Sequence, residues 1–138
     1  MKMLVCHDGS GSAQSALEKS IAMFKSERPE IILVTVAEEP ADASSYDEAA
    51  FEGWRAEREA SLKITADWVV KQGLNVDAIL AVGDPRKMLV EAVNKKKPDI
   101  VVVASRPPKG GVRFGNITVS VSDYLIHHIT DCPVLVMH

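Results

Sequence analysis

The stretch NVDAILAVGDPRKMLVEAVNKKKPDIVVVA, residues 75–104, decides the fold class of this chain. Residues 75–82 and 100–104 are short apolar runs rich in β-branched side chains, as strands are. Between them, Gly83-Asp84-Pro85 predicts a helix start, because an aspartate caps the first amides and a proline suits the first helical position. Apolar residues then recur at helical spacing through Val93. A strand, a helix and a second strand in this order are typical of a parallel βαβ unit.

The same alternation continues on both sides of this unit. Upstream, strands are predicted at 3–7 and 31–37, and helices at 12–25 and roughly 46–72; downstream, a helix is predicted at 121–129 and a final strand at 133–137. Alternating elements of this kind predict an α/β fold, with one doubly wound, parallel sheet and helices on both faces. Since no composition break or repeat interrupts the chain, we expect a single domain over residues 1–138.

Composition and charge exclude several classes of protein. The chain has 138 residues, of which 46% are hydrophobic, and a formal net charge of −3, which gives no overall attraction to nucleic acid or to an anionic membrane. No apolar stretch approaches the ~18 residues that a membrane span needs, and the apolar start at residues 1–7 is too short for a signal peptide. Two cysteines, Cys6 and Cys132, are too few for a disulfide framework. We therefore expect a cytoplasmic protein that binds neither nucleic acid nor membranes.

Three segments should meet at the carboxyl ends of the central strands, where open α/β sheets bind their ligands. They are residues 6–10, 36–39 and 104–106. Asp8 follows the first strand directly, where its carboxylate could accept a hydrogen bond from a ribose hydroxyl. Asp8 could equally cap the following helix, a role that is also open to serines just after it. The sequence leaves both roles open.

The segment PPKGGVRFGNITVS, residues 107–120, is a second candidate for ligand binding. It holds Gly110 and Gly111 beside Lys109 and Arg113, and it leads into a predicted helix. Backbone amides at a helix start, next to glycines, form a natural site for an anion, and the two cations would add charge. The alternative is a surface loop whose glycines only serve its turns.

No catalytic set accompanies these candidates. The sequence has no phosphate loop of the Gly-x4-Gly-Lys-Ser/Thr type and no Gly-x-Ser-x-Gly elbow. The adjacent pair His127-His128 diverges around a helix and makes a poor metal site, so no metal ligand is assigned. Whether the chain is an enzyme is therefore left open, with slow ATP hydrolysis as the most that we expect.

Beyond these patterns, the whole chain resembles the universal stress proteins of the UspA type. The segments that carry the resemblance are VCHDGSGSAQSAL (5–17), IILVTVAEE (31–39), VGDPRKMLVEAV (82–93), PDIVVVASRP (98–107) and SVSDYLIHHITDCPVLVMH (120–138). The resemblance implies a five-stranded sheet in the order 3-2-1-4-5 and, for many members, binding of ATP or AMP, with Mg²⁺ accompanying ATP. It also implies a homodimer formed through the last strand, Pro133–Met137, which as an apolar edge strand is a liability unless it is paired.

The nucleotide-binding members of the family carry Gly-x2-Gly-x9-Gly-Ser/Thr, and this chain departs from that pattern. The three glycines fall on Ala104, Pro107 and Val119, and the hydroxyl falls on Ser120. Eleven residues, 108–118, stand where the pattern has nine. Glycine lets the backbone approach a phosphate closely, and a proline removes an amide outright. Phosphate would therefore have to be held differently here, for example by the shifted glycines of the segment 107–120.

Carried over residue by residue, the resemblance still implies a nucleotide site. Asp8 matches the acidic residue of the first loop and Val36 matches the neighbour of the adenine. The full set of candidate ligand-binding residues is Cys6, His7, Asp8, Val36, Val103, Ala104, Ser105, Lys109, Gly110, Gly111, Arg113, Ser120, Val121 and Ser122. Two functions remain open: a regulatory domain that binds an adenine nucleotide, and a nucleotide-free dimeric interaction protein whose crevice is occluded.

Overall fold

Five parallel strands form the central sheet of the computed structural model, which describes residues 1–38, 48–105 and 120–138. The strands are β1 (Lys2–Cys6), β2 (Glu30–Ala37), β3 (Val76–Val82), β4 (Ile100–Ala104) and β5 (Val134–Met137). Their order is β3-β2-β1-β4-β5, so the fold class and the strand order expected from the sequence are confirmed. Each bound lies within one residue of the strand that the apolar pattern predicts.

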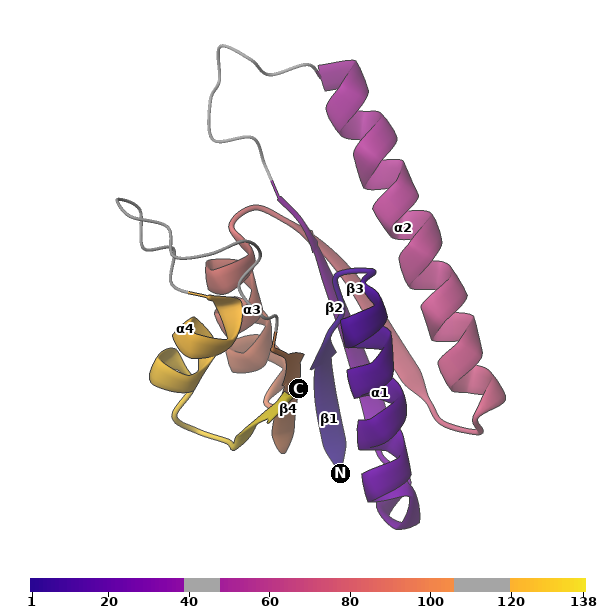
Figure 1. Ribbon diagram of the computed structural model, residues 1–138, viewed down its shortest axis with the longest axis vertical. Coiled ribbons are helices and arrows are strands. Elements are labelled where there is room, and N and C mark those ends of the chain that lie inside the picture. The colour runs from indigo at the N-terminus through magenta and orange to yellow at the C-terminus, as the bar shows by residue number, and fades with distance from the viewer. Residues whose placement is uncertain (39–47, 106–119) are drawn as a thin grey trace.

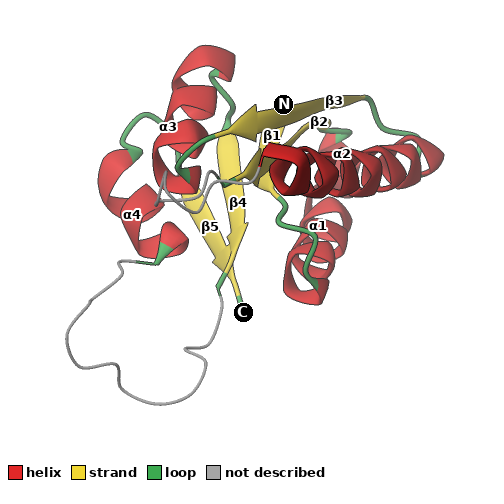
Figure 2. Ribbon diagram, turned by 90° about the horizontal axis from the view of Figure 1, so that it is seen from above, coloured by secondary structure: helices red, strands yellow, loops and turns green. Residues whose placement is uncertain are grey.

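Helices connect the strands and cover both faces of the sheet. They are α1 (Gly11–Phe24), the 3-10 turn η1 (Lys25–Glu27), α2 (Glu48–Lys71), α3 (Pro85–Lys96) and α4 (Val121–His128). Helices α1 and α2 lie on one side of the sheet, while α3 and α4 lie on the other (Figures 1 and 2). Among the described residues, no helix is both long enough and apolar enough to cross a membrane.

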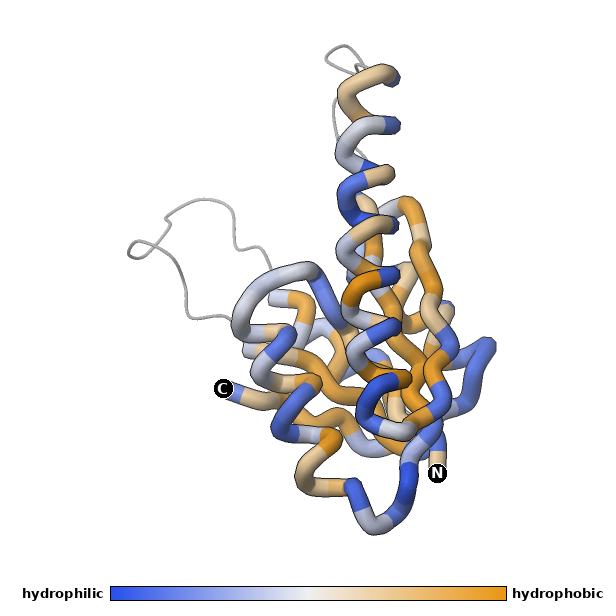
Figure 3. The backbone as a smooth tube through the Cα atoms, turned by 90° about the vertical axis from the view of Figure 1, so that its right-hand side faces the viewer, coloured by the Kyte–Doolittle hydropathy of each residue, from blue (hydrophilic) through white to orange (hydrophobic). Residues whose placement is uncertain are grey.

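Two separate apolar clusters hold these layers together, because side chains alternate between the faces of a strand. Met3 and Val5 of β1 pack toward α1 and α2, with Leu17 and Val69 among their neighbours. Leu4, between them, packs in the opposite cluster toward α3 and α4. Both clusters are almost fully removed from solvent, which makes the central strands apolar throughout, as the orange strand segments of Figure 3 show.

Parallel pairing brings the carboxyl ends of the strands to one edge of the sheet. Cys6 of β1 stands opposite Val34 of β2, and Val103 of β4 stands opposite Val136 of β5. Since all strands run in the same direction, the segments that leave them start side by side at this edge. The edge is therefore the place where residues far apart in the sequence can share a ligand.

Helix α2 is longer than the sheet that it covers. Its buried side chains, Leu62, Thr65 and Val69, all lie in its C-terminal half. The N-terminal half continues past the ends of the strands, as the upper part of Figures 1 and 3 shows. This half is only partly buried, and it lies on the same side as the carboxyl ends of the strands.

Helix α3 begins as the sequence predicts. Asp84 has an extended backbone, and its Oδ1 accepts from the amide of Arg86 at 3.0 Å, while Pro85 occupies the first helical position. The same carboxylate oxygen lies 3.4 Å from Nε of Arg86. Asp84 therefore serves both as the N-cap of the helix and as a partner of a half-exposed cation.

The cap is expected to matter more than the ion pair. Asp84→Ala should lower the free energy of unfolding by about 1 kcal/mol, because one helix amide loses its acceptor. Asp84→Asn keeps an acceptor but removes the charge, so it should cost only a few tenths of a kcal/mol, as partly exposed ion pairs do. Urea unfolding of both variants measures the difference, and equal losses would show that the ion pair dominates.

Candidate functional site

A cavity of about 530 Å³ opens at the carboxyl ends of the strands. All four helices and three strands contribute to its walls. Its lining residues are Cys6, His7, Asp8, Ala13, Val34, Val36, Glu38, Trp54, Arg58, Pro85, Leu89, Val103, Ala104, Ser120, Val121 and Ser122. The cavity therefore occupies the edge at which the strand order predicts a ligand, and its volume lies in the range of small-molecule sites.

The turn after β1 fixes Asp8 at the mouth of this cavity. Asp8 is not the helix cap: the cap of α1 is Ser10, whose Oγ accepts from the amide of Ala13 at 3.1 Å. Oδ1 of Asp8 instead accepts from the amide of Ser10 at 3.0 Å and closes the turn. Gly9 between them has φ +83°, a conformation that side chains disfavour. Asp8 is thus held in place by local backbone geometry, with its carboxylate lining the cavity.

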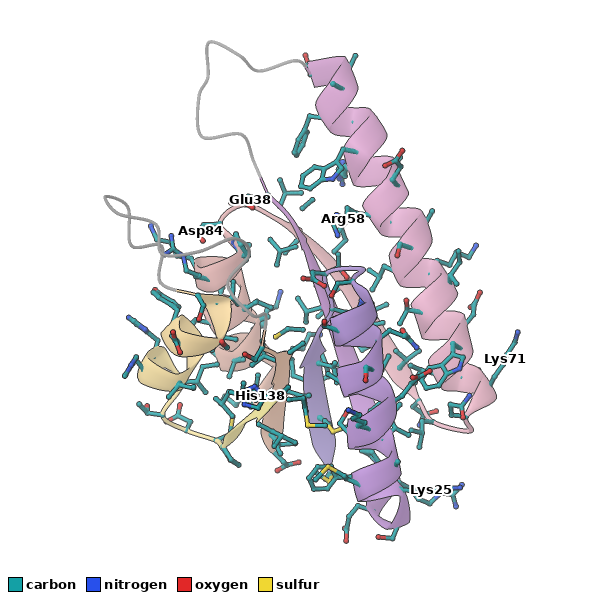
Figure 4. The ribbon with its side chains drawn as sticks, in the orientation of Figure 1. Lys25, Glu38, Arg58, Lys71, Asp84 and His138 are labelled. Carbon is teal, nitrogen blue, oxygen red and sulfur yellow. The ribbon has the colours of Figure 1, made fainter. Side chains whose placement is uncertain are left out.

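Arg58 of α2 closes over the same turn. Its Nη1 donates to the backbone carbonyl of Asp8, and its guanidinium lies 5.2 Å from the ring centre of Trp54. A Cβ on Gly9 would stand 3.2 Å from Nη1 of Arg58, so the glycine also makes room for this contact. Figure 4 shows Arg58 reaching from α2 toward the end of the sheet, on the same side as Glu38.

The side chain of His7 holds the same turn from the core side. Only 6% of this residue is exposed, and its Nδ1 accepts from the amide of Gly9 at 3.0 Å. The ring proton therefore resides on Nε2, which donates to Oε1 of Gln14 at 3.1 Å. Burial lowers the pKa of His7 below 6.5, and the hydrogen bond with Gln14 offsets part of that effect. The imidazole is neutral at neutral pH, as the hydrogen bond that Nδ1 accepts from Gly9 requires.

The start of α4 supplies the polar part of the opposite wall. Ser120 is the N-cap, and its Oγ accepts from the amide of Asp123 at 3.2 Å. The hydroxyl of Ser122 is buried and lies 3.2 Å from that of Ser120. The first amides of a helix have no partner within the helix and carry its positive dipole end. An anion in the cavity would find this helix end beside two hydroxyls.

Apart from Glu38, the rest of the wall is apolar. Val36, Leu89 and Val103 come from β2, α3 and β4 and form a surface suited to a flat, apolar group. Cys6 also behaves as an apolar part of this surface, because burial raises the pKa of its thiol to about 12 and keeps it neutral. A thiol of that pKa is protonated and unreactive at neutral pH. The cavity thus combines one apolar surface with charged and hydrogen-bonding groups at its ends.

Nine of the candidate residues meet in this cavity. They are Cys6, His7, Asp8, Val36, Val103, Ala104, Ser120, Val121 and Ser122. Ser105 does not line it; its amide donates to the carbonyl of Met137 at 2.8 Å and extends the pairing of β4 with β5. Lys109, Gly110, Gly111 and Arg113 lie outside the described residues, as do Pro107 and Val119.

The principal residues that sequence reasoning missed are Trp54 and Arg58. They are four positions apart in α2 and therefore share one face of the helix. That face carries the buried Leu62 one turn later. Their spacing relative to Leu62 was a signal that they continue the inward-facing stripe, but nothing in the sequence shows that the stripe passes over the ligand edge.

Known proteins resemble this chain in both sequence and fold. The sequence matches the universal stress protein family over residues 1–138. The chain belongs to the universal stress protein family. This match confirms the resemblance that the sequence motifs indicate. No curated protein sequence gives a significant match.

Solved structures share the fold at low sequence identity. The chain is similar to the universal stress protein UspA from Lactobacillus plantarum, with 16% identity, a TM-score of 0.78 and coverage of 100% of this chain and 97% of that one. It is also similar to a universal stress protein from Arabidopsis thaliana with AMP bound (21% identity, TM-score 0.66, coverage 99% and 90%). A universal stress protein in complex with cAMP gives 21% identity, a TM-score of 0.69 and coverage of 100% and 96%. At these identities the likeness establishes the fold.

The buried imidazole of His7 should make stability depend on pH. Its folded pKa lies below 6.5, so the unfolded chain takes up a proton first as the pH falls. The stabilisation is complete above pH 6.5 and is lost between that pH and the lower, folded pKa. Urea unfolding at a series of pH values should therefore show a falling free energy of unfolding through this window.

His7→Asn provides the control, because its amide oxygen can accept from the Gly9 amide but does not titrate. The difference between wild type and His7→Asn removes the contribution of carboxylates that titrate in both proteins. We expect that difference to change below pH 6.5. Parallel pH curves for the two proteins would contradict the assignment.

Proposed function

We propose that this universal stress protein domain is regulatory and binds an adenine nucleotide, ATP or AMP, in the cavity at the carboxyl ends of its strands. The observation that carries the proposal is the convergence of Asp8, Val36 and the start of α4 on one cavity. These three elements are far apart in the sequence and come together only through the order of the strands.

The parts of the cavity match the parts of a nucleotide. Val36, Leu89 and Val103 offer an apolar surface for the base, and the carboxylate of Asp8 is an acceptor for ribose hydroxyls. The N-terminus of α4, with Ser120 and Ser122, suits a phosphate. Two structural neighbours are complexes with AMP and with cAMP, which supports a nucleotide as the ligand class.

Metal binding and turnover are not part of the proposal. Within residues 1–38, 48–105 and 120–138, no group of three or more histidine, cysteine, aspartate or glutamate side chains could hold a metal ion. Of the described residues around the cavity, Asp8 and Glu38 are the acidic ones that line it, and they follow different strands, β1 and β2. We therefore assign binding of the nucleotide to this site and leave any Mg²⁺ to the phosphates of ATP.

A negative charge at the cap of α4 should prevent phosphate binding. Ser120→Asp keeps the N-cap, since aspartate caps as well as serine, but adds a carboxylate next to the proposed phosphate position. Wild type at a ligand concentration 100 times the dissociation constant should gain about 2.7 kcal/mol of stability. Thermal unfolding with AMP or ATP should show this gain for wild type and little or none for Ser120→Asp.

Ser120→Asn is the matched control, because it also caps the helix and carries no charge. It should retain most of the stabilisation by nucleotide. If wild type gains no stability from AMP, ADP or ATP, and no nucleotide is released from the freshly purified protein in mass spectrometry, the nucleotide proposal fails. The nucleotide-free interaction protein would then be the better description.

We also propose that the chain forms a homodimer through β5. This strand lies at the edge of the sheet and pairs with β4 alone among the described strands. The carbonyls of Pro133 and Met137 accept from β4, so their peptide groups face inward. Peptide groups alternate along a strand, which leaves those of Val134 and Val136 facing outward. An open apolar edge of this kind favours pairing with a second copy.

The edge can be tested without damage to the sheet. Val136→Pro removes an outward amide but no hydrogen bond to β4, and proline is tolerated in edge strands. Light scattering should give twice the 15.0 kDa chain mass for wild type and a shift toward the single-chain mass for Val136→Pro. Val136→Thr keeps the amide and should remain dimeric. A monomeric wild type, or a Val136→Pro variant that dimerises as tightly, would refute this interface.

A further inference from the structure

One stripe of side chains runs along α2 from the core to the cavity. Its members recur at spacings of three and four residues: Phe51, Trp54, Arg58, Leu62, Thr65 and Val69. Residues at these spacings share one face of a helix. Leu62, Thr65 and Val69 are buried against the sheet, whereas the three N-terminal members are half-buried. The stripe therefore passes from the core onto the edge at which the strands end.

Arg58 is the charged member of this stripe. It stands one turn before the buried Leu62, at a position where an apolar side chain would simply extend the core. A cation that lines a partly buried cavity loses hydration and needs a compensating partner. The packing of α2 therefore gives no reason for an arginine at this position, and its partners indicate what it does there.

Two contacts hold the guanidinium in a fixed place. Nη1 donates to the carbonyl of Asp8, and the ring of Trp54 lies 5.2 Å from the guanidinium carbon. A guanidinium has five N–H donors in one plane, so a single backbone acceptor uses a minor part of its capacity. A planar donor group that is already oriented matches two oxygens of a phosphate.

The charges around the cavity also indicate that Arg58 binds an anion. Asp8 and Glu38 are acidic and would repel an anionic ligand. Among the described residues that line the cavity, Arg58 is the one lysine or arginine. It comes from α2, on the face of the sheet opposite to α4 (Figure 2), so it approaches the cavity from the side away from Ser120. A phosphate held between these two sides would meet the helix start from one and the cation from the other.

We propose that Arg58 binds a phosphate group of the nucleotide and thereby makes the cavity select phosphorylated adenosine over adenosine itself. This inference rests on the proposed function. The chemistry that Arg58 recognises is a phosphate ester, which a 5′-phosphate and a 3′,5′-cyclic phosphate both provide. The contact with Trp54 limits the freedom of the guanidinium beside the cavity.

The experiment compares phosphorylated and unphosphorylated ligands on matched variants. Adenosine, AMP and cyclic AMP are titrated by calorimetry into wild type, Arg58→Gln and Arg55→Gln. Arg55 lies in the same part of α2, pairs with Glu52 at 3.8 Å and does not line the cavity, so its replacement makes the same change in charge away from the site. Comparison of AMP with cyclic AMP distinguishes the two sources of phosphate.

Wild type and Arg55→Gln should prefer at least one of the phosphorylated ligands over adenosine. Arg58→Gln should lose that preference by about tenfold or more, as expected for a hydrogen bond to a charged group, while its affinity for adenosine falls clearly less than its affinity for the phosphorylated ligands. Equal losses for adenosine and for the nucleotides would mean that Arg58 only supports the shape of the cavity, and would overturn the inference. Unchanged nucleotide affinity in Arg58→Gln would also overturn it.

A second variant distinguishes loss of phosphate binding from a folding defect. Arg58→Leu continues the apolar stripe of α2, and this packing should offset part of the lost contact with the Asp8 carbonyl. Thermal unfolding should therefore show a folded variant that still lacks the preference for phosphate. Retention of that preference in Arg58→Leu would overturn the inference. If wild type binds adenosine but shows no preference for phosphate, the inference alone fails. If wild type binds none of the three ligands, the proposed function fails, and this inference fails as well.

Discussion

Parallel pairing of strands that are buried on both faces is the constraint on which the rest of the structure depends. Two apolar clusters, one on each face, remove β1, β2 and β4 almost completely from solvent. Strands in such a position can carry no polar function along their length, so polar residues appear where the strands end. Because the strands are parallel, those ends share one edge, and Asp8, Glu38 and the start of α4 meet there. The location of the cavity follows from the way in which the core is built.

Most of the fold was predictable because its signals are local. Runs of β-branched residues fix β2 and β4, and Asp84-Pro85 marks the start of α3 to the residue. Much of the site was predictable for a related reason: residues such as Asp8 follow a predicted strand directly, and topology alone assigns them to the edge. Ser105 shows the limit of that reasoning, since it also follows a strand but its amide is used in pairing with β5. Trp54 and Arg58 were missed because their position depends on how far α2 extends beyond the sheet.

The turn after β1 illustrates how a binding group is held before a ligand arrives. Asp8 is fixed by the amide of Ser10, by a glycine with positive φ and by Arg58 at its carbonyl. His7 adds a further hydrogen bond to the same turn from the core side. Each contact is individually modest, but together they leave the carboxylate little freedom, which lowers the entropy that a ligand would otherwise have to remove. Asp8 therefore needs no role as a helix cap to explain its fixed position.

Helix α2 links the stability of the fold to the chemistry of the cavity. Its C-terminal half contributes Leu62 and Val69 to the core, which fixes the direction of the helix. The direction of the helix also sets the direction of the inward face of its N-terminal half. An arginine at position 58 on that face therefore brings a cation to the ligand edge. The resemblance implies glycines at positions where the backbone approaches a phosphate, and the first of these positions is Ala104 here. A side chain that reaches in from a rigid helix can supply charge to such a cavity without any close approach of the backbone, and this chain has one in place at Arg58.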